Sequence, residues 1–173
     1  VLDRLVELFR ARTPVPTRGR HACVFPLPVD PAFPAELERA LATTLAPRRL
    51  ARLRADIGEN RGELVRYVAP WNDPACLPAG SVDWLLSHSV LEHVDDLDGV
   101  YAAMAAWLAP GGLMTHLVDF WSHDLTPAWN GHWAINERLW WLMRGRRPYL
   151  LNRAWCRQHL ERLEANGFTV LEQ

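Results

Sequence analysis

The spacing of hydrophobic positions changes along the chain. In residues 1–10 and 34–57, apolar residues recur every three or four positions, which predicts amphipathic helices. Pro47 divides the second stretch into one kinked helix or two short ones. Residues 63–69 and 81–87 are short runs of β-forming residues and predict strands. The second run is almost wholly apolar, as expected of a strand covered on both faces.

A further helix and strand follow the second run. Apolar residues recur at helical spacing from Leu97 to Leu108, and Asp95 or Asp96 can cap this helix. The turn "APGG" ends it, and residues 113–118 then predict a strand. Strands that alternate with a helix indicate an α/β fold, with a mostly parallel sheet and helices on its faces.

The C-terminal third predicts helices at residues 136–143 and 153–165, the second capped by Asn152, and a last strand at residues 168–173.

We therefore expect a single domain over residues 1–173. Residues 64–119 would be its strand–helix–strand core. Residues 120–173 would hold a substrate lid with the final helix and strand.

Composition and charge narrow the classes of protein. The 173 residues are 49% hydrophobic and 23% charged, which is ordinary for a globular chain. A net charge of −1 supplies no strong field for nucleic acid or an anionic membrane, so we expect neither partner. No apolar run is long enough to span a bilayer, and a cytoplasmic protein is expected. Three scattered cysteines argue against a disulfide framework or a zinc site.

A polar cluster follows the apolar run at residues 81–87. It consists of Ser87, His88, Ser89, Glu92 and His93. Ligands bind outside the carboxyl ends of strands in open α/β sheets, so the cluster stands where a site is expected. The simpler interpretation is a helix cap with ordinary surface histidines. The position of the cluster alone favours neither the ligand site nor the helix cap.

The motifs in this region give further evidence, beyond the position of the polar cluster. Asp83 in a strand, the turn "VLEHV" at 90–94 and "LAPGG" at 108–112 stand in one order over about forty residues. This pattern resembles the second half of the class I S-adenosylmethionine-dependent methyltransferases. The resemblance implies a Rossmann-like methyltransferase fold and S-adenosylmethionine as cofactor.

The same resemblance implies cofactor contacts after two predicted strands. The loop that would contact the adenine holds Trp71, Asn72 and Asp73, and Asp73 could accept from the adenine amino group. The other implied contacts follow the strand at residues 81–87 and are Ser87, His88, Leu91 and Glu92.

Three residues are candidates for catalysis. Methyl transfer from a sulfonium mainly requires alignment, and a hydroxyl acceptor also needs a proton acceptor. His93 and His116 suit that role, and Asp119 can orient an imidazole or take the proton itself. His116, Asp119 and His123 also form a conceivable metal set. Strand residues three apart point to opposite faces, so we expect no metal.

The glycine-rich turn of this family is missing from its expected place. The stretch "ADIGENRG" at 55–62 resembles it superficially, but only eighteen residues separate Gly62 from Ser81. A single βαβ unit needs about 30 residues, so we interpret the stretch as a helix stop and turn. The fold is therefore expected to be incomplete in its N-terminal half, either as the C-terminal portion of a longer enzyme or as a degenerate relative.

These observations lead to one expected function and one alternative. The expected function is methyl transfer from S-adenosylmethionine to a small-molecule or saccharide acceptor, with Trp121 and Trp129 in a substrate lid. Without the glycine-rich turn, this chain alone would bind the cofactor weakly. The alternative is a non-catalytic Rossmann-like binding module that has lost its cofactor loop. The oligomeric state stays open.

Overall fold

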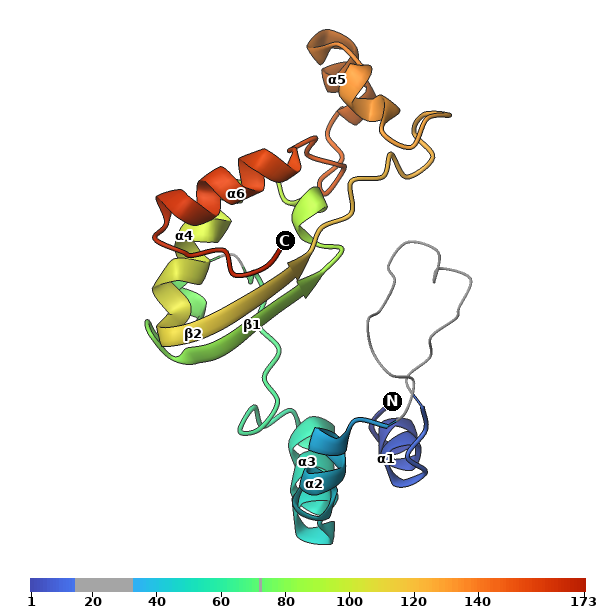
Figure 1. Cartoon of the computed structure of the whole chain (residues 1–173), viewed down its shortest axis with the longest axis vertical. Helices are drawn as coiled ribbons and strands as arrows, with labels where there is room; N and C mark the ends of the chain where they lie inside the picture. Colours follow the sequence, from blue (N-terminus) through green and yellow to red (C-terminus); the bar gives the residue numbers. More distant parts are fainter. Residues whose placement is uncertain (15–32, 72) are drawn as a thin grey trace. The chain divides into compact units, whose positions relative to one another are not determined.

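The computed structural model describes residues 1–14, 33–71 and 73–173, and divides the chain into two compact units, residues 1–67 and 68–173 (Figure 1). Each unit packs mainly on itself, and the single domain predicted from the sequence stays a prediction.

The first unit is helical. It contains α1 (Leu2–Arg10), α2 (Ala35–Thr44) and α3 (Pro47–Glu59). The predicted helices are therefore confirmed, with the second stretch forming two helices. Pro47 stands in the first turn of α3, where its missing N–H costs nothing.

The strand predicted at residues 63–69 is wrong. After α3, the buried carboxylate of Asp56 accepts hydrogen bonds from the backbone N–H groups of Glu63, Leu64 and Val65, at 2.8, 3.0 and 2.7 Å. These amides are committed to a side chain, so they do not enter a strand ladder. The predicted core of residues 64–119 consequently begins later than expected.

The second unit contains the predicted strand–helix–strand. Strand β1 (Val82–His88) pairs in parallel with β2 (Leu108–Leu117), and α4 (Leu97–Trp107) connects them (Figure 1). The carboxylate of Asp96 caps α4 by accepting from the backbone N–H of Gly99 at 2.9 Å, as one of the two predicted caps. The α/β class with parallel strands is confirmed, although the described sheet has only two strands.

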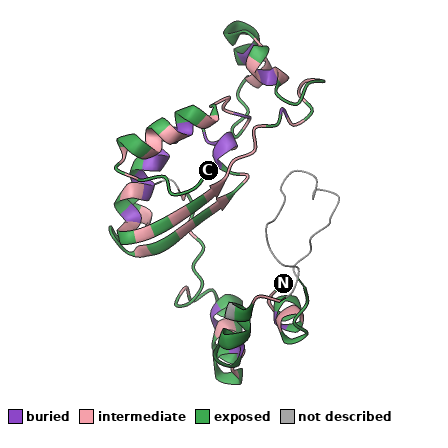
Figure 2. Ribbon diagram, viewed as in Figure 1, coloured by how far each residue is buried: buried purple, intermediate pink, exposed green. Residues whose placement is uncertain are grey.

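The core of this unit lies between α4 and one face of the sheet. Figure 2 shows the buried residues concentrated on α4 and the turn before it. Half-buried Val82, Leu85 and Met114 of the sheet pack against this cluster. The buried members are Leu91, Val94, Leu97, Val100, Tyr101, Ala103, Met104 and Trp107.

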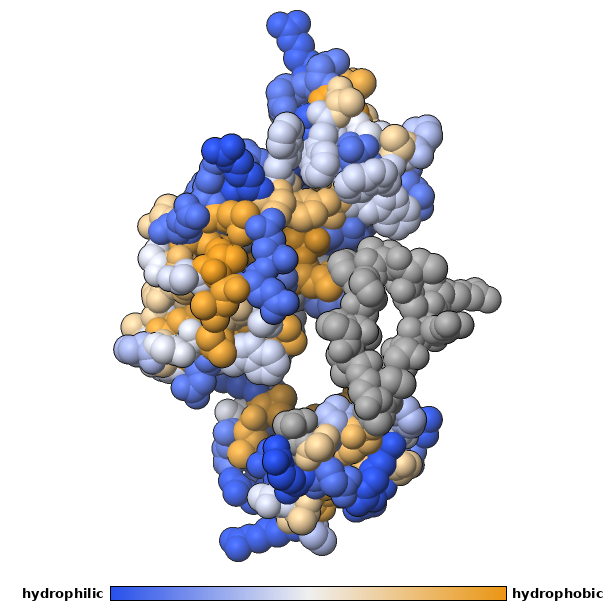
Figure 3. Space-filling model, viewed as in Figure 1, coloured by the Kyte–Doolittle hydropathy of each residue, from blue (hydrophilic) through white to orange (hydrophobic). Residues whose placement is uncertain are grey.

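The opposite face of the sheet is open, which corrects the expectation of a strand covered on both faces. Trp84 and Leu86 of β1 are 62% and 64% exposed, and Leu113 of β2 is 55% exposed. The apolar run forms a strand, but no described element within residues 68–173 covers this face. Figure 3 shows hydrophobic residues gathered on the side of this unit that is in view.

The C-terminal region forms α5 (Glu137–Arg144) and α6 (Cys156–Ala165). Three single 3-10 turns precede β1, α4 and α5, at Pro74–Cys76, Leu91–His93 and Gly131–Ala134 respectively. Asn136 caps α5 by accepting from the N–H of Leu139 at 2.9 Å. Helix α6 begins later than predicted, since Arg153 has a φ of +66°, which lies outside the right-handed helical region. Residues 168–173 form no strand, since no described strand pairs with them. That last prediction is wrong.

Candidate functional site

The two parallel strands end side by side and lead into a tight turn. Ser87 and His116 are register partners near the strand ends. Beyond them, the N–H of Ser89 donates to the carbonyl of Leu117 at 2.8 Å. Ser89 has a φ of +50°, so the chain reverses here and enters the 3-10 turn Leu91–His93. The predicted polar cluster is thus held at the carboxyl edge of the sheet.

Asn152, from a distant part of the chain, holds the turn Leu91–His93 by hydrogen bonds. Its Nδ2 donates to the carbonyls of Leu91 and Val94 at 2.6 and 2.8 Å, and its backbone N–H donates to the carbonyl of Glu92 at 2.8 Å. The sequence predicts Asn152 as a helix cap and misses this role. The partners lie about sixty positions earlier, and no local pattern reveals them.

A cavity of about 310 Å³ opens beside this turn, and we call it the strand-end pocket. It is of the size that a small ligand occupies. Among the predicted catalytic residues, His93 lies on its wall. The Nδ1 of His93 is 2.9 Å from the carbonyl oxygen of Tyr149. The lining residues are Trp71, Ser89, Val90, His93, Val94 and Tyr149.

His116 is turned into the interior rather than into the strand-end pocket. Its Nδ1 is 2.7 Å from the hydroxyl oxygen of Ser87, and its Nε2 is buried with no hydrogen-bond partner among the described residues. Burial lowers the pKa of His116, which favours the neutral imidazole. Ser87 and His116 therefore form a pair with each other.

Tyr101 and His159 form a second pair, which is buried, and the Tyr101 ring lies 6.3 Å from the ring of His116. The hydroxyl of Tyr101 and the Nδ1 of His159 are 2.9 Å apart. Burial raises the pKa of Tyr101 to about 12. Burial, aided by the positive charge of Arg162, lowers the pKa of His159 to about 4. Both groups are therefore neutral near pH 7, and their bond is part of the core.

The other predicted contacts are spread over different environments. Leu91 is fully buried in the core, and Glu92 is 4% exposed with both carboxylate oxygens unpartnered among the described residues. His88 is exposed at the end of β1. Asp73 is exposed and accepts from the N–H of Ala75 at 2.8 Å. Asp119 accepts from the N–H of Trp121 at 2.8 Å and so orders the loop after β2.

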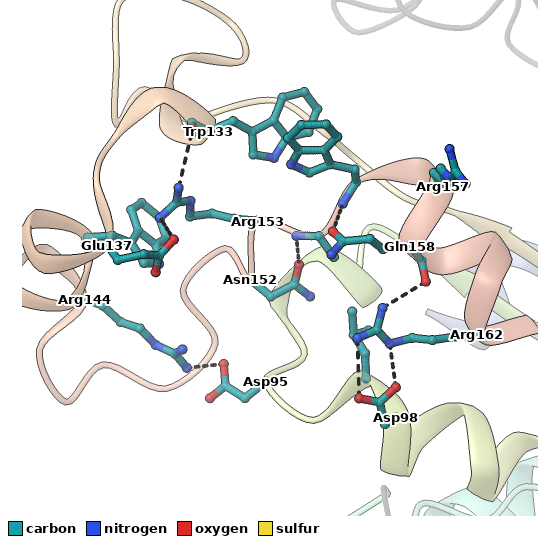
Figure 4. Close-up of a pocket in the computed structure, with 14 residues that line it drawn as sticks. Asp95, Asp98, Trp133, Glu137, Arg144, Asn152, Arg153, Arg157, Gln158 and Arg162 are labelled. Carbon is teal, nitrogen blue, oxygen red and sulfur yellow. Dashed lines mark hydrogen bonds and ion pairs between the residues drawn. The ribbon is translucent and has the colours of Figure 1, made fainter. Parts of the chain in front are cut away.

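A larger cavity of about 670 Å³ lies between α5, α6 and the start of α4, and sequence reasoning misses it (Figure 4). We call it the arginine pocket. Its walls combine four arginines with three carboxylates and three tryptophans. They are Asp95, Leu97, Asp98, Trp133, Glu137, Trp140, Arg144, Asn152, Arg153, Ala154, Trp155, Arg157, Gln158 and Arg162.

The cations of the arginine pocket are paired with nearby acids. Arg162 meets Asp98 at 2.8 Å, and Arg144 pairs with Asp95. Arg153 lies 3.1 Å from the Glu137 carboxylate, and it is also stacked 5.1 Å over the Trp140 ring. Arg157 is paired along α6 with Glu161. The pocket is thus polar but nearly neutral. From the sequence alone, the arginine cluster at residues 144–147 favours a solvated helix face or end over a phosphate-binding role.

The described residues before β1 contain no glycine-rich turn after a strand. Instead, α3 ends at Asn60, whose φ is +52°, and Gly62 follows with a φ of +71°. Both values lie in the left-handed region that ends helices. The interpretation of "ADIGENRG" as a helix stop and turn is confirmed.

Comparison with known proteins agrees with the resemblance seen in the sequence. The methyltransferase-domain family model matches residues 30–115, which include β1, the strand-end turn, α4 and most of β2. No curated protein and no solved structure matches the chain. The chain therefore carries a class I S-adenosylmethionine-dependent methyltransferase domain, matched over residues 30–115.

Proposed function

We propose that the strand-end pocket binds S-adenosylmethionine and that the chain transfers its methyl group to a small-molecule or saccharide acceptor. One observation carries the proposal. The pocket opens at the carboxyl ends of two parallel strands, inside the segment that matches the methyltransferase family. That edge is the ligand-binding edge of open α/β sheets.

The residues of the pocket suit part of this cofactor. Trp71 and Tyr149 offer aromatic rings for the adenine, and the neighbouring lining by Val90 and Val94 suits the methionine chain. No acidic side chain lines the strand-end pocket to accept from the ribose hydroxyls. Since that contact is missing from the described residues, we expect weak binding.

The chain's own residues then have to align the acceptor. When bound, S-adenosylmethionine supplies an electrophilic methyl group. His93 is the predicted catalytic residue that faces the pocket, and its Nδ1 is fixed by the carbonyl of Tyr149. Its Nε2 is then available to hold an acceptor hydroxyl and take its proton. Asp119 and His116 stay candidates, although His116 is bonded to Ser87 in this structure.

The arginine pocket favours a neutral, hydroxyl-rich acceptor. It adjoins the strand-end pocket in sequence, because Val94 lines one and Asp95 lines the other. Its arginines are engaged by acids, which leaves little net attraction for a phosphate. Exposed Trp155 supplies a stacking surface, and Gln158 supplies amide groups for hydroxyls. This combination supports a saccharide-like acceptor.

Calorimetric titration with S-adenosylmethionine tests the cofactor proposal. Trp71→Leu keeps apolar volume but removes the ring, and we expect it to weaken binding about 10-fold or more, a stacking loss of about 1–2 kcal/mol. Trp141→Leu is the matched control, since Trp141 is 75% exposed and lines neither pocket. Absence of binding by the unchanged chain would favour the alternative, a non-catalytic binding module.

The acceptor proposal is tested by kinetics with a panel of saccharides. Trp155→Ala is expected to raise the KM for the acceptor while leaving the KM for S-adenosylmethionine unchanged, because Trp155 lines only the arginine pocket. Trp141→Ala again serves as control. A preference for phosphorylated acceptors would contradict the assignment of a neutral ligand.

A further inference from the structure

Three side chains with metal-ligating atoms converge beside the strand-end pocket. Glu92 and His93 are adjacent in the 3-10 turn, and His123 lies in the loop after β2. One ligand atom from each lies within 4.8 Å of the others. We propose that Glu92, His93 and His123 bind a divalent transition-metal ion. This inference does not rest on methyl transfer.

The Glu92 carboxylate indicates an occupant. Its side chain belongs to a residue only 4% exposed, and neither oxygen has a hydrogen-bond partner among the described residues. An ionised carboxylate buried without a partner is strongly unfavourable, and folded proteins leave few such groups unpaired. A cation between Glu92 and the two imidazoles supplies the missing partner.

His93 is oriented as a metal ligand. Its Nδ1 lies 2.9 Å from the carbonyl oxygen of Tyr149, and a carbonyl can only accept. The proton is therefore assigned to Nδ1, which leaves the lone pair on Nε2 free. Histidines that bind metals usually donate their other N–H to a carbonyl or carboxylate in this way.

His123 is the third member of the cluster, and the carboxylate of Asp119 lies next to its ring. Its ring meets the His93 ring edge to face, with centroids 5.2 Å apart. Its Nε2 is buried, and the nearest acid is Asp119, whose Oδ2 is 3.4 Å away. A metal ion held by both imidazoles would accept one nitrogen lone pair from each ring. Asp119 is placed to orient His123 or to act as a further ligand.

The donor set selects the class of ion. Two imidazoles and one carboxylate suit zinc, iron or cobalt, whereas magnesium and calcium prefer oxygen donors. Three protein ligands also leave a coordination position open. Because His93 lines the strand-end pocket, the ion would stand at the pocket wall. Metal binding and proton acceptance are then alternative roles for His93 Nε2.

A cobalt titration tests the site without any methyl donor. The full chain is stripped with a chelator and titrated with Co²⁺, which absorbs visibly when bound by nitrogen and oxygen ligands, and Zn²⁺ is then added as competitor. We expect one Co²⁺ per chain, displaced by Zn²⁺. Glu92→Gln and His123→Gln should each weaken binding by at least about 10-fold. His88→Gln, an exposed histidine outside the cluster, is the control and should bind as the unchanged chain does.

Three results would overturn the proposal. The first is the absence of Co²⁺ and Zn²⁺ binding by the unchanged chain at millimolar metal. The second is binding that is equally strong in both cluster variants, and the third is binding that is lost equally in His88→Gln. Circular dichroism checks the fold of each variant. If Glu92→Gln fails to fold, His123→Gln, on the loop after β2, decides alone. Failure here leaves cofactor binding in the strand-end pocket intact, so the two proposals are distinguishable.

Discussion

Single residues determine how the strand-end turn is held. Local capping is predictable from the sequence, because Asp96 and Asn136 bond to amides three positions ahead. Asn152 has the same side-chain chemistry as Asn136, but its partners lie 58 and 61 positions earlier. A sequence pattern carries no information about such a distance. The same holds for the buried pair of Tyr101 and His159, which no sequence motif predicts.

Removing the Asn152 amide should loosen the turn. Asn152→Ala leaves the carbonyls of Leu91 and Val94 without their donors, and we expect a loss of about 1–3 kcal/mol in the free energy of unfolding. Urea denaturation measures this loss. Asn130→Ala, at an exposed position without a side-chain cap bond, should change stability by less than about 0.5 kcal/mol. Equal losses in both variants would contradict the role given to Asn152.

Buried His159 should make stability fall in mild acid. Its folded pKa of about 4 lies below the ordinary 6.5, so the unfolded chain takes up the proton first as the pH falls. The contribution is fully present above pH 6.5 and is lost as the pH falls towards 4, a loss of about 3 kcal/mol. His159→Gln cannot titrate there, and its unfolding free energy should decline less between pH 7 and pH 4.5. Parallel pH profiles for the two proteins would refute this account.

At the scale of elements, apolar runs identify strands only where backbone groups are free to pair. Strand β1 and helix α4 follow the pattern of the sequence, whereas β2 begins at Leu108 rather than at Leu113 and so includes the predicted turn "APGG". The run at residues 63–69 has equally good β-forming residues, yet Asp56 takes three of its amides. Residues 168–173 have no partner strand among the described residues. The pattern of residues therefore predicts whether a segment favours a strand. Whether the strand forms depends on which groups bind its backbone amides.

The Asp56 carboxylate should stabilise the turn after α3. Asp56→Ala removes the acceptor of three amides, and we expect a lower melting temperature, equivalent to about 1–3 kcal/mol. These hydrogen bonds lower the pKa of Asp56, and the bond from Glu63 contributes most. The stabilisation by the carboxylate is therefore fully present above the ordinary carboxyl pKa, and it is lost as the pH falls through the lowered pKa. Glu59→Ala, which removes only an exposed ion pair with Arg61, should have little effect.

At the scale of the whole molecule, the sequence predicts the class of fold better than the extent of the sheet. The strand-end pocket lies beside the predicted polar cluster, with His93 on its wall, and ligand binding there stays a prediction. The sequence does not predict the open face that carries Trp84, Leu86 and Leu113, because an apolar strand does not reveal what covers it. Within the described ranges, no helix has the length and apolar character that crossing a bilayer requires.

Ultraviolet cross-linking of tritium-labelled S-adenosylmethionine to the full chain, followed by peptide mapping, shows whether the strand-end pocket holds the methyl donor. We expect label in the peptides that contain Trp71 or residues 89–94, suppressed by excess S-adenosylhomocysteine. Label confined to the peptides of the arginine pocket, or no label that the competitor suppresses, would contradict it.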